Sequence, residues 1–465
     1  MTENGGPEPG RLGLSTKFGL VGERDFGCLW GARTISHLGD YAFRIAFATY
    51  IISETRSPNV LAVSTAVLVV PSLVFYLVGG AVSDRVTSRR AVMVIADLAR
   101  FVITALLALG VATSDSIPLL VGLALLISIG EGFFRPASFA FMKDIVPRKR
   151  LMSANSSMSI SQQIGIIGGP LLGGALVGLA GPALAFAFDA VTFLISGVLI
   201  LLISRQSDAR ASDADGVPES STDPARGVRG VLADVKAGLK YIRGQGWLLV
   251  SLSVGPGANA LFAGVLAVTI PLIMAPNGSP DAGFLGWYYA MQAVGALTGA
   301  VLLGRLTFTR LGRSLFIILG LMGVSLAVVG VLGKTPVTFA MAFTYGLGLH
   351  IFNTLYRTLL HEKVPDSMTG RVSSVSDLAF NGAMPLGQIV IGPLAVAFTA
   401  EGATLGAGAV AALVCFTAAL APGIRALRLD TSGVEPEERG EAPLGSGAKP
   451  DTAPATVKDP DSRLR

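Results

Sequence analysis

Ionisable residues recur at helical spacing in one apolar stretch near the N-terminus: Arg33, His37, Asp40 and Arg44. At 100° per residue they fall within about 60° of arc, so they form a polar stripe that must face other protein or a water-filled cavity. His37 and Arg44 lie within one turn of Asp40 and would keep it ionised until a conformational change loosens the contacts. The stripe predicts proton handling by Asp40, with a fixed, stiffening ion-pair stripe as the alternative.

Other carboxylates lie in later apolar stretches. Glu131 and Arg135 are four residues apart near the middle of theirs, which places them on one helical face. Asp189 lies close to the outer end of its stretch and is a poorer candidate for a buried proton site. We therefore predict Asp40 and Glu131 as the proton-handling carboxylates, tuned by Arg135 and Arg44.

The second half of the chain supplies intramembrane polar groups without carboxylates. His350, Asn353 and Arg357 share one helical face, and aromatic residues lie nearby in the sequence. This mixture suits a large amphipathic ligand, although each group could instead make a contact between packed helices. The residues predicted to line a substrate cavity are Arg33, Asn259, Tyr288, Gln292, His350, Asn353, Arg357 and Asn381.

The composition identifies the elements that must hold these residues. Of 465 residues, 51% are hydrophobic and 14% charged, and the mean hydropathy is +0.62. A soluble chain of this length could not hide so much apolar surface, which argues against a soluble enzyme. Cys28 and Cys415 are expected to be free thiols. The net charge of +5 is assigned to cytoplasmic loops. No metal, cofactor, nucleic acid or nucleotide-binding loop is predicted.

The hydropathy pattern predicts about twelve spans of roughly 19 to 28 residues, the length that a bilayer requires of a helix. With the N-terminus in the cytoplasm, the basic loop residues lie inside except Arg56 and Lys334. The positive-inside rule therefore predicts that both termini are cytoplasmic. The spans begin near Phe26, Val60, Ala91, Ile117, Ala154, Ala183, Leu248, Phe284, Ser314, Val337, Val372 and Ala403.

Polar stretches divide the chain. An Asp- and Ser-rich linker is followed by a basic amphipathic segment, expected to lie on the inner leaflet or else to begin the next span. The predicted parts are a cytoplasmic N-terminal tail (1–25), a six-helix bundle (26–204), a cytoplasmic linker with an amphipathic helix (205–247), a second six-helix bundle (248–428) and a disordered cytoplasmic tail (429–465).

An internal repeat favours two similar halves. Arg135, Val146-Pro147 and Gly169-Pro170 recur as Arg357, Val364-Pro365 and Gly392-Pro393, at offsets near 220 residues. Two facing six-helix bundles are the architecture that alternating access requires, with a substrate site between them.

One charged run joins two apolar stretches, Gly80-Ala-Val-Ser-Asp-Arg-Val-Thr-Ser-Arg-Arg90. Its glycine would let a neighbouring helix approach closely. Except at Thr87, the run resembles the loop motif Gly-x-x-x-Asp-Arg-x-Gly-x-Arg-Arg of the major facilitator superfamily. The resemblance implies an all-α polytopic membrane protein with 12 transmembrane helices in two pseudo-symmetric six-helix bundles, the major facilitator fold. The predicted conformational switch comprises Gly80, Asp84, Arg85, Arg89, Arg90, Asp97 and Arg100, the last two networking with Asp84.

A glycine-rich run characterises the predicted fifth helix. Its spacing matches the Gly-x-x-x-Gly-Pro-x-x-Gly-Gly pattern of the drug/proton antiporters in that superfamily, and the resemblance implies export in exchange for protons. A helix that only packs closely against its neighbours is the alternative. The matching residues are Gly165, Gly169, Pro170, Gly173 and Gly174.

Two further stretches, Phe26–Asp40 and 364–372, resemble the branch that contains macrolide-efflux proteins and the enterobactin exporter. The resemblance covers roughly residues 26–427. It implies a multi-pass protein of the bacterial inner membrane that exports antibiotics, siderophores or a self-made metabolite. We expect the protein to function as a monomer. Ser128 stands where drug exporters usually carry an arginine. A proton-coupled importer of a polar nutrient and a non-transporting scaffold or sensor remain the alternatives.

Overall fold

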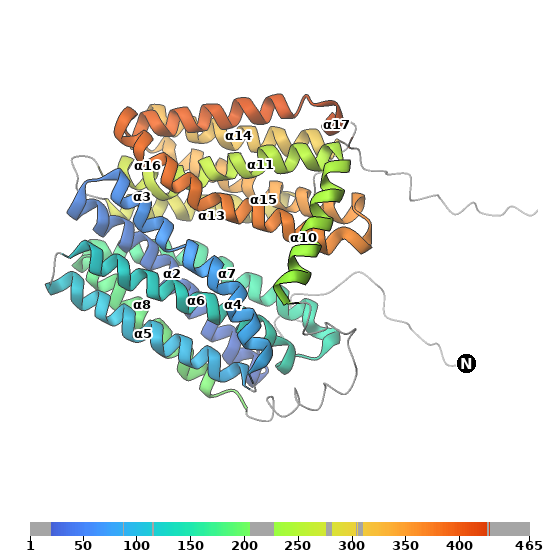
Figure 1. The fold of residues 1–465 in the computed structure, drawn as a ribbon. Coiled ribbons are helices and arrows are strands. Elements are labelled where there is room, and N and C mark those ends of the chain that lie inside the picture. The colour runs from blue at the N-terminus through green and yellow to red at the C-terminus, as the bar shows by residue number, and fades with distance from the viewer. Residues whose placement is uncertain are drawn as a thin grey trace, which may run out of the picture. The chain divides into compact units, whose positions relative to one another are not determined.

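The structure is a computed structural model that describes residues 20–86, 88–113, 116–204, 227–275, 281–303, 305, 310–425 and 427. Within these residues it contains helices and no strand (Figure 1). The helices of the first half are α2 (Arg24–Thr55), α3 (Pro58–Val67), α4 (Val70–Arg85), α5 (Arg89–Thr113), α6 (Ile117–Ile145), α7 (Leu151–Ala180) and α8 (Pro182–Leu201), with a short 3-10 turn at Arg148–Arg150.

The second half contains a basic helix followed by further long helices. The assigned helix α16 has a non-helical residue inside it, Thr399 at φ 64°, between the expected spans that begin near Val372 and Ala403. The helices are α10 (Gly227–Gly244), α11 (Gly246–Gly264), a π-helical segment (Val265–Thr269), α12 (Ile270–Ile273), α13 (Ala282–Leu303), α14 (Leu311–Leu332), α15 (Val337–Lys363), α16 (Asp366–Ala418) and α17 (Pro422–Arg425).

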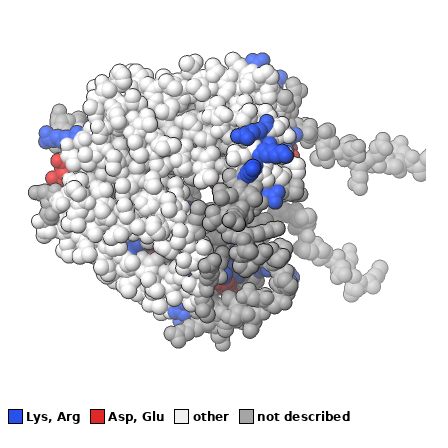
Figure 2. All heavy atoms as spheres, viewed as in Figure 1, with Lys and Arg blue, Asp and Glu red and all other residues white. Residues whose placement is uncertain are grey.

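Eight helices of the described residues are long and apolar enough to cross a membrane. The side chains on their outer faces include Leu98, Leu109 and Val396, each more than half exposed, as suits contact with lipid. On the face seen in Figure 2, the Lys, Arg, Asp and Glu side chains that are coloured gather mainly toward the two ends of the helices. The predicted class, an all-α polytopic membrane protein, is confirmed. The count of twelve spans stays a prediction.

The helix α2 is absent from those eight because its charged stripe lowers its hydropathy. Local sequence also sets where helices end. Gly181 and Gly333 follow α7 and α14 with φ of 80° and 61°, a conformation that glycine adopts without steric cost. Ser57 caps α3 by accepting a hydrogen bond from the Val60 N–H.

The glycines of α7 allow it to lie directly against α2. A Cβ at Gly173 would lie 2.7 Å from the Ala42 carbonyl oxygen, and one at Gly169 would lie 2.4 Å from the Tyr41 Cβ. Neither position can hold a larger residue unless the helices separate. Trp30 also donates to the Ser157 carbonyl over 2.9 Å, so the two helices form one unit.

The helix α5 packs against α6 and α8, and α16 packs against α11 and α14 (Figure 1). Between these two groups, α7 packs against α13 and α3 packs against α16. A Cβ at Gly174 would lie 2.5 Å from the Ala282 carbonyl oxygen, and one at Gly392 would lie 2.7 Å from the Ala62 Cβ. These close contacts lie near the ends where α3 and α13 begin, which we call the closed end.

The amphipathic segment is the separate helix α10, because Gln245 interrupts the chain before α11. It packs on α16, where a Cβ at Gly238 would lie 3.1 Å from the Arg371 carbonyl oxygen. Lys236, Lys240 and Arg243 are exposed. The predicted flexible linker before α10 and the whole of the predicted C-terminal tail (429–465) lie outside the described residues.

Candidate functional site

The charged stripe of α2 is divided among three environments. Arg33 and His37 line a cavity of about 250 Å³ that Arg135 also lines. Asp40 turns toward α5, and Arg44 lines a second cavity between the two helix groups. One helix therefore links two cavities and a buried charge network.

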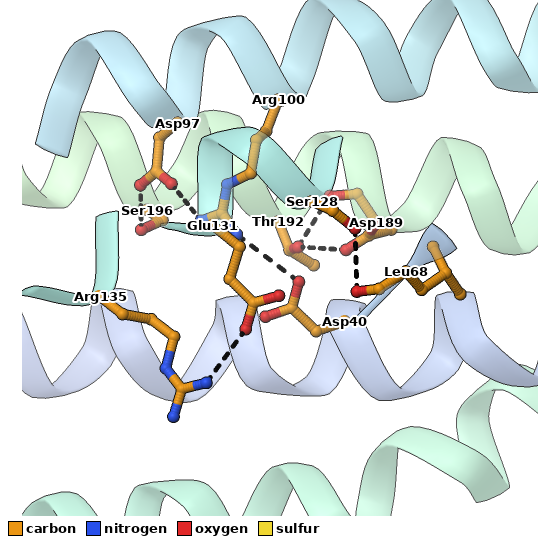
Figure 3. A network of polar contacts seen from close by, with 10 residues as sticks. All are labelled: Asp40, Leu68, Asp97, Arg100, Ser128, Glu131, Arg135, Asp189, Thr192 and Ser196. Carbon is orange, nitrogen blue, oxygen red and sulfur yellow. Dashed lines mark hydrogen bonds and ion pairs between the residues drawn. The ribbon is translucent and has the colours of Figure 1, made fainter. Parts of the chain in front are cut away.

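Arg100 of α5 is the centre of that network (Figure 3). Its guanidinium lies 2.6 Å from Asp97 and 3.7 Å from Asp40. The second Asp97 oxygen accepts a hydrogen bond of 2.6 Å from Ser196 of α8. Arg100 and Asp97 are almost fully buried, so each charge depends on these partners for its stability.

Aromatic rings complete the surroundings of Arg100. Its guanidinium carbon lies 4.1 Å from the ring centre of Phe193 and 4.9 Å from that of Phe134, which is close enough for cation–π attraction. Gly130 leaves room for the side chain, since a Cβ there would lie 2.7 Å from the Arg100 Cγ. The arginine is thus held in one place by three neighbouring helices.

The network corrects the expected partner of Asp40. Sequence spacing indicated His37 and Arg44, but the ion pairs found among the described residues join Asp40 to Arg100. Asp97 and Arg100, assigned from the sequence to the loop around Asp84, therefore belong with Asp40. The side chains of Asp84 and Arg85 lie outside the described part, so a link from the network to them stays a prediction.

Asp189 is a residue whose importance the sequence analysis missed. It is 1% exposed, and its carboxylate accepts a hydrogen bond of 3.3 Å from Thr192. A Cβ at Gly39 would lie 2.2 Å from its Oδ1, so Asp189 lies directly against the residue before Asp40. The i, i+3, i+7 spacing of Asp189, Thr192 and Ser196 marks a polar face that could have identified it.

The predicted pair on α6 is present. Glu131 and Arg135 lie 3.7 Å apart, with 25% and 54% of their side chains exposed. One turn earlier, Ser128 donates a hydrogen bond of 2.9 Å to the Leu68 carbonyl, at the break between α3 and α4. Ser128 thus provides a hydrogen-bond donor to a backbone carbonyl that the break in the helix leaves without one. The sequence comparison, which noted only that serine stands where drug exporters usually carry arginine, did not suggest this role.

The central cavity has a volume of about 260 Å³ and lies between the two helix groups. From the first half it is lined by α2, α3 and α7, including Tyr41, Arg44 and Pro170. From the second half, Tyr289 and Gln292 of α13 are among its lining residues. Its lining is mostly apolar with a few polar groups, the composition typical of small-molecule sites.

Tyr289 has a definite structural role in this cavity. The π-helical segment before α12 changes the backbone hydrogen-bond spacing, so the Leu266 carbonyl would need the N–H of residue 271. Residue 271 is a proline and has none. The Tyr289 hydroxyl donates to Leu266 instead, which fixes the tyrosine ring at the cavity wall.

The predicted substrate residues are spread over separate cavities. Asn259, Asn353, Arg357 and Asn381 line a cavity of about 290 Å³ within the second half. Gln292 lines the central cavity and Arg33 the cavity of the first half.

Two predicted residues, Tyr288 and His350, line none of these three cavities. Tyr288 is fully buried among packed helices, so the tyrosine that faces the central cavity is its neighbour Tyr289.

The cavities of the two halves lie toward the ends of α6 and α15, opposite the closed end.

The charged loop holds the first-half helices together. Arg89 forms an ion pair of 2.7 Å with Asp144 at the end of α6, and Arg90 donates to the carbonyls of Ile200 and Leu201 at the end of α8. The predicted close approach at Gly80 is wrong for this conformation, since no described atom lies within 4 Å of a Cβ built there. Gly79 makes that approach instead, facing the Gly132 carbonyl.

The described residues contain no group of three or more His, Cys, Asp or Glu side chains that could hold a metal ion. Cys28 and Cys415 are both free. Asp281 and Lys334 form an ion pair of 2.7 Å at the closed end, and the hydrogen bond from Lys334 lowers the pKa of Asp281. This exposed pair is separate from the buried network.

Comparison with known proteins agrees with this architecture. The Major Facilitator Superfamily description matches residues 29–387. The multidrug efflux pump Tap of Mycolicibacterium fortuitum is 26% identical over 368 residues, covering 76% of this chain and 84% of Tap. Macrolide efflux protein A of Streptococcus pyogenes is 24% identical over 374 residues, covering 78% of this chain and 88% of that protein.

Among solved structures, a bacterial homologue of the iron transporter ferroportin in an inward-facing state has a TM-score of 0.61 at 18% identity. The alignment covers 85% of this chain and 98% of that structure, which indicates a shared fold. The helices, the cavity between two helix groups and the match over most of the sequence describe a transport protein, not an enzyme. The chain belongs to the major facilitator superfamily of membrane transporters.

Proposed function

We propose that this transporter exports a small amphipathic molecule across the bacterial cytoplasmic membrane in exchange for protons. The observation that carries the proposal is Asp40, a carboxylate inside the helix bundle that is held by one arginine and lies one turn from a residue of the central cavity. Relatives named as efflux pumps support the direction of transport, and so does the glycine motif of α7.

Protonation of Asp40 is the proposed trigger. A neutral Asp40 attracts Arg100 less strongly, while Asp97, at 2.6 Å, retains it. The contact between α2 and α5 then weakens, although the buried arginine keeps a partner. A proton that binds there therefore changes the relative stability of two conformations, which is what coupling to transport requires.

The proposed movement separates the helix groups at the closed end and brings them together at the other. Gly174 of α7 and Gly286 of α13 each face backbone atoms of the opposite helix there, and the ion pair described at that end, Asp281 with Lys334, lies within the second half. Such a contact can open and close without leaving buried charge unpaired. In this conformation the cavities within the two halves lie on the opposite side, toward the proposed cytoplasm.

The remaining predicted groups take roles around this cycle. We propose Glu131 with Arg135 as a second proton-handling pair and the loop around Asp84 as the latch of the first half. We also propose cytoplasmic termini, two six-helix halves joined by the linker, and function as a monomer. One proton moving inward gains roughly 2.3 kcal/mol per 100 mV, and each pH unit adds about 1.4 kcal/mol.

The test is accumulation of dyes and antibiotics in an efflux-deficient bacterium that expresses the wild type, Asp40→Asn or Asp281→Asn. We expect the wild type to lower accumulation, and Asp40→Asn or a protonophore to return it to that of cells without the protein. Asp281→Asn is the matched control, because it removes an exposed carboxylate paired with Lys334 outside the network.

Unimpaired export by Asp40→Asn at equal expression would refute the coupling role. If no compound is exported, uptake of polar nutrients is measured in the same strains: gradient-driven uptake would identify an importer. Absence of both activities would favour a scaffold or sensor.

A further inference from the structure

The central cavity has one charged residue in its lining. Arg44 is that residue, and among the described side chains that line the cavity there is no carboxylate. The rest of the wall is apolar or neutral and polar, with the rings of Tyr41 and Tyr289 on opposite helices. The cavity is therefore positive and aromatic, which disfavours a cationic ligand.

Arg44 has no ion-pair partner among the described residues. Its guanidinium carbon lies 5.5 Å from the centre of the Tyr41 ring. Asp40, one turn earlier, is engaged by Arg100. Arg44 is exposed and lines the cavity, so its guanidinium is open to a partner there, and a charge placed inside a membrane protein faces water or such a partner.

The wall opposite α2 offers a complementary group. The side-chain oxygen of Gln388 on α16 is buried and has no hydrogen-bond partner in the described structure, and Gln388 also lines the cavity. Gln292 lines the wall nearby, on α13. Because the Tyr289 hydroxyl already donates to Leu266, these amides are the neutral polar groups that this wall can offer a ligand.

We propose that the exported substrate carries an anionic group, most simply a carboxylate, which binds Arg44 in the central cavity. Its apolar body lies between Tyr41 and Tyr289, and a hydroxyl or N–H group of the ligand donates to Gln388. At about 260 Å³, the cavity encloses a compact molecule in this conformation. The inference rests on the proposed function, because it takes this cavity as the transport site.

This assignment separates two tasks along α2. Asp40 binds the proton and is held by Arg100, whereas Arg44 binds the substrate anion one turn away. A carboxylate and a guanidinium can form two parallel hydrogen bonds, which gives the site geometric specificity as well as charge. The substrate therefore does not compete with Asp40 for its own arginine.

The test measures direct binding to the purified full-length protein. The probes are phenylacetate, naphthalene-1-acetate and indole-3-acetate, each radiolabelled and paired with its neutral amide. We expect at least one acid to bind about tenfold more tightly than its amide. Arg44→Gln should remove that preference and leave amide binding within about twofold, while Arg44→Lys should restore part of it.

Arg243→Gln is the control, because Arg243 is an exposed arginine of α10 away from the cavity. Equal affinity of every acid and its amide for the wild type would overturn the inference, as would an acid preference that survives in Arg44→Gln. A thermal melt of each variant establishes that it is folded.

Counterflow separates this inference from the proposed function. Proteoliposomes preloaded with the unlabelled acid exchange it for labelled acid without a proton gradient, so Asp40→Asn should retain exchange and Arg44→Gln should lose it. Exchange that depends on Arg44 but is never driven by a proton gradient would contradict the proton coupling and leave the anion site standing.

Discussion

At the scale of single residues, Arg100 determines how the buried charges depend on one another. It is shared between Asp97 and Asp40 at 2.6 and 3.7 Å, so one carboxylate is bound tightly and the other loosely. A loosely held carboxylate can exchange its arginine for a proton at lower cost. In the proposed proton cycle, the asymmetry of the two distances favours Asp40, rather than Asp97, as the carboxylate that binds the proton.

Ser196→Ala tests whether the tightly held Asp97, which binds Arg100, is needed for stability and transport. Ser196 is fully buried and donates to Asp97, so its loss leaves a charged oxygen short of a donor at a cost of about 1–3 kcal/mol. We expect a lower apparent Tm in detergent and weaker proton-driven export. Ser156→Ala is the matched control, because Ser156 is exposed and bonds only to its own helix. Equal Tm values for the two variants would contradict this account of the network.

The candidate site was predictable from the sequence only in part. Spacing along one helix placed Glu131 beside Arg135, and that ion pair is confirmed. The same reasoning chose the wrong partner for Asp40, because Arg100 comes from another helix and spacing within α2 carries no information about α5. It also undervalued Asp189, since position along α8 does not reveal that Gly39 lets that carboxylate pack against α2.

At the scale of helices, small residues decide which surfaces meet. In α7 the face with Gly165, Gly169 and Gly173 touches α2, and Gly174, 100° further around the helix, touches α13. The helix is therefore packed on both sides by backbone rather than by long side chains. Such an interface is smooth, and its energy comes from many small dispersion contacts that any added atom disrupts.

Gly173→Ala and Gly178→Ala form a matched pair on α7. A Cβ at Gly173 would lie 2.7 and 2.8 Å from backbone atoms of Ala42, whereas one at Gly178 meets no described atom within 4 Å. We expect Gly173→Ala to lower the apparent Tm and the yield of folded protein. Gly178→Ala should be neutral or stabilising by up to about 1 kcal/mol, because alanine favours helix. Equal stability would mean that α2 and α7 are not packed this closely.

The helical class was predictable because long apolar stretches have few alternatives in a bilayer. The details of how the helices pack were harder to predict from the sequence. The motif glycine Gly80 has open space in front of it, and its neighbour Gly79 makes the close contact. The two residues point 100° apart around the helix, and the sequence motif does not show which of them faces the neighbouring helix. In the π-helical segment at Val265–Thr269 the Leu266 carbonyl likewise takes its donor, the Tyr289 hydroxyl, from another helix, and local sequence does not reveal that donor.

At the scale of the whole molecule, the proposed transport cycle requires the contacts at the closed end to break. The α3–α16 contact offers a direct test, because a Cβ at Gly392 would lie 2.7 Å from that of Ala62. Cysteines at both positions, in a background without Cys28 and Cys415, need a shift of only about 1 Å to reach disulfide geometry. We expect the oxidised double variant to lose export and a reductant to restore it.

The single-cysteine variants provide the control, since oxidation should leave their export unchanged. The bond acts on one conformation only: it stabilises the closed end and should therefore still permit binding of a carboxylate probe from the opposite side. Substrate binding without transport is the combination that distinguishes a locked conformation from a misfolded protein. Full export by the oxidised double variant, with the bond confirmed by mass spectrometry, would show that α3 and α16 stay together throughout the cycle and that the opening lies elsewhere.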